Sequence, residues 1–384
     1  MKNLYFYASC IHNPDTLSGG DRIFIELARQ WKKKANITII TSPEGKELCK
    51  KYYLNLDYIV ITHKAGDIAK LASLFLKRLF SGIKFAFKTN LEPGFIYSTS
   101  NFISDSFPSS ILKLRTNSVW IAGYYLEPPN PFYGYDESKT KIKFPGFSDL
   151  AFWVQDKLSK FLIKHFADII YVTSQPDAEK FPNKKKVIIK GGVDTHLPEK
   201  IKNSKNPEFD SVFIGRFHQE KGVLELIDIW KLVMSKNPGS KLAMIGNGPL
   251  EKAVKDKIKK LRLEKNIILF GFKDGLEKIK IFKNSKIVLH PARYDSGGMA
   301  AAEAMACKLP GVSYDLEALK TYYPQGMLKT KIGNKEQFAE NILLLLKDKK
   351  LYNKLSKQAY ELAKEWSWPE RAEEIHGQTF RNHI

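Results

Sequence analysis

Short β-rich segments alternate with helical stretches along the chain, and they form two separate series. The first series comprises LYFYAS (4–9), ITIITS (37–42), YIVIT (58–62), FIYST (95–99), VWIAGYY (119–125) and IIYVTS (169–174). The second comprises SVFIG (211–215), KLAMIG (241–246), NIILFGF (266–272), KIVLHP (286–291) and GVSYD (311–315). Helical segments between strands are typical of parallel βαβ units, because parallel strands need a long crossover. The sequence therefore predicts an α/β protein with two domains.

A polar, lysine-rich stretch with prolines, THLPEKIKNSKNPEFD (195–210), separates the two series. We expect an N-terminal domain over 1–194, a linker over 195–208 and a C-terminal domain over 209–364. The remaining segment, 365–384, contains a helix beyond the last expected strand, which we expect to cross back to the first domain. A chain of 384 residues with 43% apolar residues is long enough for two cores.

Composition limits the compartment and the partners. The three cysteines, Cys10, Cys49 and Cys307, are far apart and odd in number, which favours neither a disulfide framework nor a metal site. No signal-peptide pattern starts the chain, and no uncharged apolar run reaches the roughly 18 residues that span a bilayer. We expect a cytoplasmic protein, free or bound peripherally to the membrane face. The net charge of +21 is consistent with a polyanion partner such as nucleic acid, anionic lipid or a phosphorylated substrate. Solvated helix faces are the alternative, because many of the lysines are spread through expected helices.

The loop after SVFIG offers two cations at a strand end. Gly215 ends the expected strand, Arg216 follows it, and Lys221 and Gly222 precede the next helix. Ligands of open parallel sheets collect at the carboxyl ends of strands. An arginine fork and a lysine point charge there can bind a diphosphate together. Ordinary surface cations are the alternative.

A second strand-end turn, IGNGPLEKAV, contains Gly246 and Gly248 before a proline suited to the first helical position. The dinucleotide-binding fingerprint would need a third glycine where Glu251 stands, so the pattern does not favour NAD. The turn can equally be a tight connection without a ligand.

The stretch DSGGMAAAEAMA (295–306) places two acids around a glycine pair. Gly297 and Gly298 leave main-chain amides uncovered before an expected helix, where an anionic group can bind. Asp295 and Glu303 repel phosphate but can accept hydrogen bonds from hydroxyls. Amides and cations for phosphate, with carboxylates for hydroxyls, are complementary to a nucleotide sugar. The alternatives are that Asp295 caps the helix and that Glu303 pairs with a lysine.

Several motifs resemble family 4 glycosyltransferases and follow that family's order. YDSGGMAAAEAMACKLP (294–310) is similar to the E-x7-E segment, with Asp295 and Glu303 in the two acidic positions. The other matches are SGGDRIFIELA (18–28), GGVD (191–194), IGRFHQEKG (214–222), GNGPL (246–250), FGF (270–272) and WSWPERA (366–372). Together they cover nearly the whole chain, and the resemblance implies a GT-B fold, in which two Rossmann-like domains face each other across a cleft.

The resemblance implies a retaining glycosyltransferase that moves a hexosyl unit from a UDP- or GDP-sugar without a metal or other cofactor. Arg216 and Lys221 would bind the leaving diphosphate, and Asp295 and Glu303 the hydroxyls of the sugar and the ribose. The further donor-binding residues implied by the matching motifs are Gly19, Gly20, Gly215, Gly246, Gly248, Phe272, Gly298, Met299 and Ala300. No DxD-type metal pair lies near this expected site.

Three residues depart from the family pattern. Asp295 is one methylene shorter than the usual glutamate, and Lys308 replaces the glycine that usually ends the helix. Leu126, in GYYLEPPN (123–130), stands where relatives often have a histidine. The proton of the acceptor then passes either to the leaving phosphate or to Glu127, and both remain open.

Two basic amphipathic segments suggest where the acceptor lies. Over 67–88 we expect one helical stripe of apolar residues, Ile68, Leu71, Leu74, Phe75, Leu79 and Phe80, bordered by Lys70, Lys77, Arg78, Lys84 and Lys88. A similar helix is expected over 152–166. Such helices bind anionic membrane surfaces, which favours a lipid-linked acceptor besides a soluble glycan. A core-facing helix is the alternative.

Two other functions stay open. The chain can be a catalytically inactive sugar-binding protein on the same fold, a reading that turnover of the donor would exclude. A basic nucleic-acid-binding protein would also explain the charge, but no RNP, zinc-finger or helix-turn-helix signature is present.

Overall fold

The computed structural model describes residues 1–62, 71–135, 142 and 144–381, and it divides the chain into two compact units. The first unit comprises the residues up to Gly134, the stretch that ends at Gly191, and the C-terminal segment from Trp368. The second comprises Gly192–Ser367 together with Tyr135. The two-domain α/β prediction is confirmed, and the units are described separately below.

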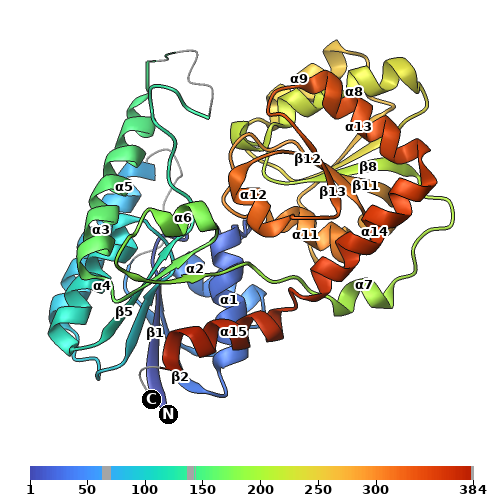
Figure 1. The fold of residues 1–384 in the computed structure, drawn as a ribbon. Helices are drawn as coiled ribbons and strands as arrows, with labels where there is room; N and C mark the ends of the chain where they lie inside the picture. The colour runs from blue at the N-terminus through green and yellow to red at the C-terminus, as the bar shows by residue number, and fades with distance from the viewer. Residues whose placement is uncertain (63–70, 136–141, 143, 382–384) are drawn as a thin grey trace. The chain divides into compact units, whose positions relative to one another are not determined.

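The first unit is a parallel sheet covered by helices on both faces (Figure 1). Its strands are β1 (Lys2–Ala8), β2 (Ala35–Thr41), β3 (Asp57–Val60), β4 (Phe95–Ser98), β5 (Val119–Tyr124), β6 (Ile169–Val172) and β7 (Lys185–Ile188). Within the described residues they lie in the order β3-β2-β1-β4-β5-β6-β7. Its helices are α1 (Gly19–Trp31), α2 (Pro43–Lys51), α3 (Leu71–Lys88), α4 (Ile103–Thr116), α5 (Phe147–Phe166), α6 (Gln175–Glu179) and α15 (Trp368–Phe380).

The central strand β1 explains why this sheet is buried on both faces. Leu4 pairs in register with Ile37 of β2 and with Phe95 of β4, and the five residues Leu4–Ala8 are all buried. Strands of this kind read as continuous apolar runs because helices cover both faces of a parallel sheet. The order of strands reverses between β1 and β4, so the carboxyl ends of these two strands form the topological switch point.

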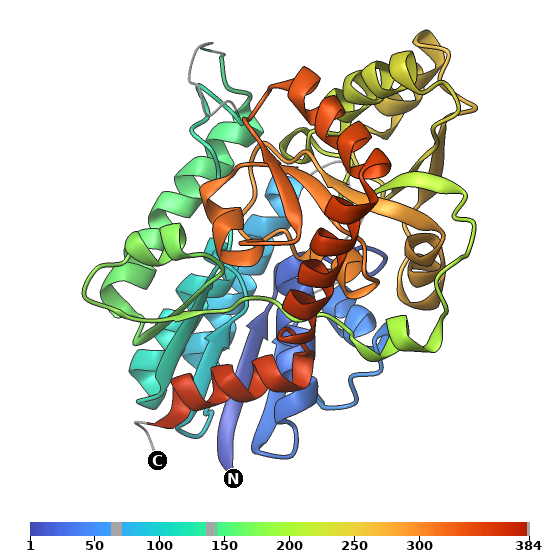
Figure 2. The same cartoon turned by 45° about the vertical axis from the view of Figure 1, so that its right-hand side comes forward.

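The C-terminal helix α15 packs on α1, as we expected from its place beyond the last strand (Figure 2). The indole Nε1 of Trp31 donates a hydrogen bond of 2.9 Å to the carbonyl of Ala372. The Trp31 ring also meets Phe380 edge-on, with 5.6 Å between the ring centroids. The last segment of the chain therefore belongs to the first unit.

The second unit repeats the doubly wound design. Its strands are β8 (Phe209–Ile214), β9 (Leu242–Ile245), β10 (Ile267–Gly271), β11 (Ser285–His290), β12 (Gly311–Tyr314) and β13 (Met327–Thr330). In the described part they lie in the order β10-β9-β8-β11-β12-β13, so β8 and β11 form the switch point. Its helices are α7 (His196–Lys200), α8 (Val223–Lys236), α9 (Glu251–Lys260), α10 (Gly275–Lys283), α11 (Met299–Ala306), α12 (Glu317–Tyr322), α13 (Lys335–Lys347) and α14 (Lys349–Lys364).

Two apolar clusters, one on each face, hold this second sheet. One joins the strands to α8, α9 and α13 around the fully buried Trp230. The other joins them to α10, α11, α12 and α14 around Trp366. The short helix α11 packs so closely because its buried residues are mostly alanine, which lets the helix backbone approach its neighbours.

The stretch 195–208, which we expected to be a linker, lies on the second unit and starts with α7. Ser204 N donates to the carbonyl of Lys283, and the Lys283 ammonium donates to Asn203 Oδ1, at 2.9 and 2.6 Å. These contacts tie a polar segment to the surface of the domain, which composition alone does not reveal. Strand β13 was not predicted either, since its sequence MLKT is short and only partly apolar.

Part of the apolar stripe expected over 67–88 lies on α3, and residues 67–70 lie outside the described part. Leu74, Phe75 and Leu79 are half-buried, whereas Phe80 is exposed. Arg78, expected beside a membrane surface, is fully buried. Its guanidinium donates to Glu44 Oε2 at 2.9 Å and to two backbone carbonyls of the loop after β1.

Candidate functional site

The predicted donor residues lie around the carboxyl ends of β8 and β11, at the switch point of the second unit. Arg216 lies two residues after the end of β8, and Asp295 lies five residues after the end of β11. In doubly wound sheets this is the place where ligands bind, because the two neighbouring loops diverge from each other there.

The β8–α8 loop holds the two predicted phosphate-binding cations. The Arg216 side chain is 57% exposed and its Nη2 donates to Glu220 Oε1 at 2.9 Å. Lys221 is closer to the protein, with 20% of its side chain exposed. Gly222 follows at φ +65°, and a Cβ atom there would lie 2.0 Å from the carbonyl oxygen of Pro291. The loop can therefore pass this close to the β11 end only with glycine at that position.

Lys221 forms an ion pair with Asp295, with 2.8 Å between Nζ and Oδ2. Burial by itself lowers the pKa of Lys221, but the nearby carboxylates of Asp295 and Glu220 outweigh it, so that pKa is raised. Burial raises the pKa of Asp295, but Lys221 and His290 together hold it well below its usual value. Both groups are therefore charged at neutral pH, and the ion pair joins the two loops.

Asp295 also binds the backbone at the start of α11. Its Oδ1 accepts hydrogen bonds from the amides of Gly297 and Gly298, at 3.2 and 3.1 Å. On Oδ2, His290 Nε2 donates at 3.1 Å beside the Lys221 ammonium. A carboxylate has about four acceptor positions. All are occupied, so a sugar hydroxyl binds Asp295 only by displacing one of these partners.

The amides of Met299 and Ala300 form the first turn of α11, after Gly298 at φ +52°. Both residues are half-buried, and the positive end of the helix dipole lies at this end of the helix. The predicted anion-binding position of these two amides is thus compatible with the geometry.

Glu303 lies one turn further along α11 and pairs with Lys278, whose ammonium is 2.9 Å from both carboxylate oxygens. Lys278 also contacts Asp274 at 2.7 Å. The pairing of Glu303 with a lysine, considered from the sequence as an alternative, is therefore present. Glu303 and Asp295 both raise the pKa of the buried Tyr323, after the larger effect of its burial, which places the two predicted acids around one tyrosine.

Three glycines bring the neighbouring loops into backbone contact. Gly215 N donates to Ile245 O and Gly246 N to Gly271 O, at 3.1 and 2.8 Å. Gly246 has φ +137°, and a Cβ atom there would lie 2.0 Å from the Gly215 carbonyl. Gly248 packs against the backbone of Phe217. These glycines therefore let the loops after β8, β9 and β10 pack closely on one another. Phe272, directly after β10, is 41% exposed.

Sequence reasoning missed three residues around this site, Glu220, His290 and Tyr135. Glu220 is 4% exposed and lies between Arg216, His218 and Lys221. His290 is the last residue of β11, and its polar side chain after an apolar strand was the available signal. Tyr135 comes from the first half of the chain, yet its ring lies 5.5 Å from His218 and 5.7 Å from Tyr294.

A cavity of about 270 Å³ lies at the start of α8, lined by Tyr135, Gly222, Glu225 and Arg293 among others. It adjoins the β8–α8 loop but none of Arg216, Lys221 or Glu303 lines it.

Across the described ranges, no group of three or more histidines, cysteines or acids is placed to hold a metal ion. In the same ranges no helix is long and apolar enough to cross a bilayer.

Gly19 and Gly20 are the first two residues of α1 in the first unit, where Ser18 caps the helix in a reciprocal capping box with Asp21. They follow the loop after β1 at the switch point of that unit. Their predicted contact with the diphosphate stays a prediction.

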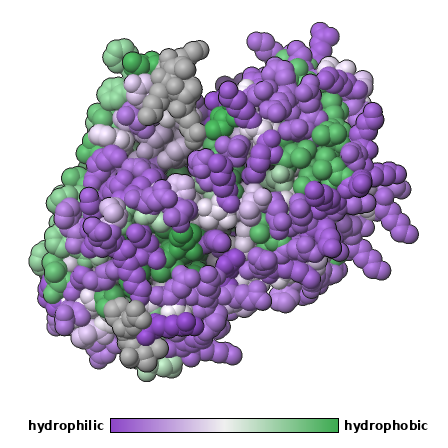
Figure 3. Space-filling view, in the orientation of Figure 1, coloured by the Kyte–Doolittle hydropathy of each residue, from purple (hydrophilic) through white to green (hydrophobic). Residues whose placement is uncertain are grey.

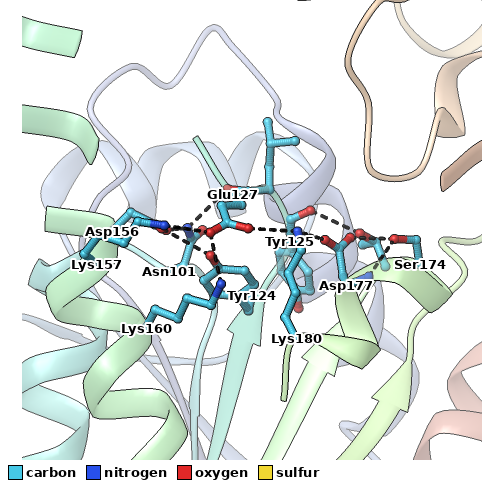
Figure 4. A network of polar contacts seen from close by, with 12 residues as sticks. Asn101, Tyr124, Tyr125, Glu127, Asp156, Lys157, Lys160, Ser174, Asp177 and Lys180 are labelled. Carbon is cyan, nitrogen blue, oxygen red and sulfur yellow. Dashed lines mark hydrogen bonds and ion pairs between the residues drawn. The ribbon is translucent and has the colours of Figure 1, made fainter. Parts of the chain in front are cut away.

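Glu127, the possible base, lies in a cluster of three lysines (Figure 4). Its carboxylate is 2.9 Å from Lys157 and 3.0 Å from both Lys160 and Lys180. Burial raises the pKa of Glu127, but hydrogen bonds and charges of these lysines prevail and lower that pKa to about 2. A carboxylate held this strongly as an anion is a weak proton acceptor near neutral pH. The preceding Leu126 contributes only its carbonyl, which accepts from Asn101 at 3.2 Å.

Comparison with known proteins identifies the second unit. Residues 196–362 match the family model described as glycosyl transferases group 1. These residues are a group 1 glycosyltransferase domain. Over 181 residues the chain is 25% identical to a poly(glycerol-phosphate) alpha-glucosyltransferase of Bacillus subtilis, with 46% of this chain and 26% of that protein covered. Over 200 residues it is 28% identical to an uncharacterized glycosyltransferase of Methanocaldococcus jannaschii, covering 52% and 54% of the two chains. The matches thus span about a quarter and about half of these relatives.

Solved structures of glycosyltransferases match the group 1 domain and the first unit together. Sucrose-phosphate synthase from Thermosynechococcus elongatus superposes with a TM-score of 0.76 at 16% identity, covering 100% of this chain and 99% of that one. HepE from Anabaena, solved in complex with UDP-glucose, gives 0.72 at 15% identity and covers both chains fully. At this identity the likeness shows the fold, and the predicted GT-B class is confirmed.

Proposed function

We propose that the protein is a retaining glycosyltransferase that transfers a hexosyl unit from a UDP- or GDP-sugar to a glycan or lipid-linked acceptor. The observation that carries the proposal is the Lys221–Asp295 ion pair at the β8–β11 switch point, inside the segment that matches group 1 glycosyltransferases. It puts a half-buried ammonium, an exposed guanidinium and the start of α11 on adjoining loops, which is the set of groups that a diphosphate needs.

Arg216 is the residue best placed to move onto a donor. Its side chain is more than half exposed and is held by a single i, i+4 carboxylate, Glu220. A diphosphate carries more negative charge than that carboxylate and offers several acceptor oxygens, so a bidentate contact with phosphate would replace the surface pair. Lys221 would approach the other side of the diphosphate while Asp295 keeps its ammonium oriented.

During transfer, the bond between the anomeric carbon and the diphosphate oxygen breaks while the acceptor oxygen bonds to the same carbon. Negative charge grows on the leaving diphosphate, and Arg216, Lys221 and the amides of Met299 and Ala300 would stabilise it. The acceptor proton would pass to the leaving phosphate, since the pKa of Glu127, at about 2, makes it a weak base. No metal or other cofactor takes part in this scheme.

The experiment is a transfer assay with purified protein and a panel of UDP- and GDP-sugars, followed by NMR of the product in the presence of excess EDTA. The proposal predicts consumption of one donor and a product with the same anomeric configuration as that donor. An inverted product would contradict the retaining mechanism. A folded wild-type protein that consumes no donor with any acceptor or with water would favour the inactive sugar-binding alternative.

A further inference from the structure

Helices α3 and α5 expose large apolar side chains in rows rather than singly. On α3, Leu76, Phe80 and Phe87 are 56%, 66% and 59% exposed. On α5, Phe147, Val154, Leu158 and Phe161 are 82%, 43%, 56% and 57% exposed. These positions are three, four or seven residues apart, so each row follows one side of its helix. We call the seven residues the α3–α5 apolar surface.

The concentration of apolar residues here is unusual for the molecule. Helices α3 and α5 have 18 and 20 residues, yet they carry ten of the twenty large apolar side chains that are exposed in the described part of the chain. In Figure 3, apolar residues gather along the margin where these helices lie. A soluble protein rarely exposes this many large apolar side chains on two of its helices, so the surface indicates a binding partner.

Aromatic rings also connect helices α3 and α5, beside the two rows. Phe75 of α3 stacks on Phe102 with 5.2 Å between centroids, and Phe102 contacts Phe152 of α5 at 5.6 Å. Phe102 precedes α4, four residues after the end of β4. This series of rings therefore runs from α3 to α5 past the carboxyl end of β4.

The charges beside this surface are basic. Lys77, Lys84 and Lys88 on α3 and Lys164 on α5 are exposed, and none of them forms a salt bridge with another described residue. The residues Leu71–Lys88 include no acid. On α5, Asp156 is fully buried, which leaves Asp149 as the exposed acid of that helix. Apolar rows bordered by lysines match a bilayer surface that contains anionic lipids.

We propose that the α3–α5 apolar surface docks the protein onto an anionic lipid bilayer, with the phenylalanine and leucine side chains in the interface and the lysines at the headgroups. A second copy of the chain fits less well. A symmetric dimer through this face would place the lysines of α3 against the same positively charged face of the partner. Lipid phosphates supply the opposite charge instead.

This docking gives the acceptor a location, an extension that rests on the proposed function. The connection through Phe102 places the strand ends of the first unit beside the bilayer surface. A lipid-linked acceptor would keep its chain in the membrane and present its hydroxyl at that edge, so no lipid extraction would be needed.

The test is flotation of the full chain with vesicles, which needs neither donor nor acceptor. Phosphatidylcholine vesicles are compared with vesicles that also contain phosphatidylglycerol. Each lysine near an anionic surface contributes about fivefold in affinity, so the anionic vesicles should bind the wild type more than tenfold better. The double variant Phe80→Ser/Phe161→Ser should lose about tenfold in partitioning. Leu344→Ser is the matched control, since Leu344 is 47% exposed on α13 of the second unit.

Two further tests concern the role of the lysines and whether a second copy of the chain, instead of lipid, covers the surface. Lys84→Glu should weaken binding to anionic vesicles, and Lys347→Glu on α13 should not. Equal binding to both vesicle types, or loss of binding in the two controls as much as in the surface variants, would overturn the proposal. Sedimentation showing a wild-type dimer that Phe80→Ser/Phe161→Ser converts to a monomer would overturn it too, because a second copy would then cover the surface. Donor turnover in lipid-free solution is measured in parallel, so failure to bind lipid is distinguishable from failure of the glycosyltransferase proposal.

Discussion

Lys221 Nζ lies 2.8 Å from Asp295 Oδ2, although the two residues are 74 positions apart in the chain. The pair connects the loop after β8 to the loop after β11, the two strands at which the sheet order reverses. Asp295 in turn accepts hydrogen bonds from the amides of Gly297 and Gly298, directly before α11. One carboxylate thus organises both sides of the switch point, and its loss should affect stability as well as donor binding.

Lys221→Met is expected to lower the free energy of unfolding by about 3 kcal/mol, because it leaves Asp295 as a buried charge without its cation. Urea denaturation of purified protein measures this change. Lys231→Met, at an exposed lysine of α8, is the control and should change stability by less than about 0.5 kcal/mol. Equal effects of the two variants would mean that the ion pair does not hold the loops.

The contribution of Asp295 should depend on pH in a defined direction. Its folded-state pKa lies below the unfolded value of about 3.9, so the ionised carboxylate stabilises the fold fully above that value. The contribution is lost as pH falls through the folded-state pKa. The difference in unfolding free energy between wild type and Asp295→Asn, measured by urea titration from pH 6 down to pH 3, should therefore shrink below about pH 4. A difference that grows with acidity would contradict the assignment.

Lys329 on β13 should lose its proton at a lower pH than an ordinary surface lysine does. Burial lowers its pKa to about 8, while its Nζ lies 3.2 Å from Ser313 Oγ. Between about pH 8 and pH 10.4 the unfolded chain holds a proton that the folded protein has lost, so this group makes folding more favourable as pH rises.

Lys329→Met tests this directly. At pH 7 the variant should be more stable relative to wild type than at pH 10.5, by up to about 3 kcal/mol between the two conditions. Lys331→Met, at an exposed position of the same segment, should show no such change with pH. A Lys329→Met profile parallel to that of wild type would exclude a lowered lysine pKa.

Glu127→Gln should leave donor turnover within about tenfold of wild type, since loss of a true general base costs about 10² to 10⁴. The expected effect is on stability instead, because Lys157, Lys160 and Lys180 lose their shared carboxylate. Thermal unfolding and initial rates of the same preparation measure both. A fall in kcat of more than a hundredfold with an unchanged donor Kd would restore Glu127 as the base.

The sequence predicts the two sheets well because most of their strands are continuous apolar runs. Runs such as LYFYAS and KIVLHP can be recognised as buried strands without knowledge of their neighbours in space. It predicts β13 poorly, since MLKT has too few apolar residues to stand out from a loop. Arg78 shows a different limit. The sequence pattern places it correctly on a helix. Its burial, however, depends on tertiary contacts with Glu44 and the loop after β1, which the pattern does not show.

Within the candidate site, motif order was enough to select Arg216, Lys221, Asp295 and Glu303. It did not predict which residues form ion pairs with them. Glu220 occurs inside the same nine-residue motif, yet its contact with Arg216 depends on the turn that the loop takes before α8. Lys278 lies 25 residues from Glu303, and only packing of α10 beside α11 brings the two together. Partners that are distant in the chain leave no local pattern in one sequence.

The central claim is that Arg216 and Lys221 bind the diphosphate of a nucleotide sugar, and calorimetric titration of UDP- and GDP-sugars tests it most directly. Arg216→Ala is compared with Lys255→Ala, whose side chain is similarly exposed, at 59%, and also pairs with an i, i+4 glutamate. The account predicts that one donor binds wild type, that Arg216→Ala weakens its Kd at least about tenfold through loss of a charge-assisted contact without lowering Tm, and that Lys255→Ala binds as wild type does. Binding by Arg216→Ala equal to wild type, or no binding of any nucleotide sugar to the folded wild type, would contradict it.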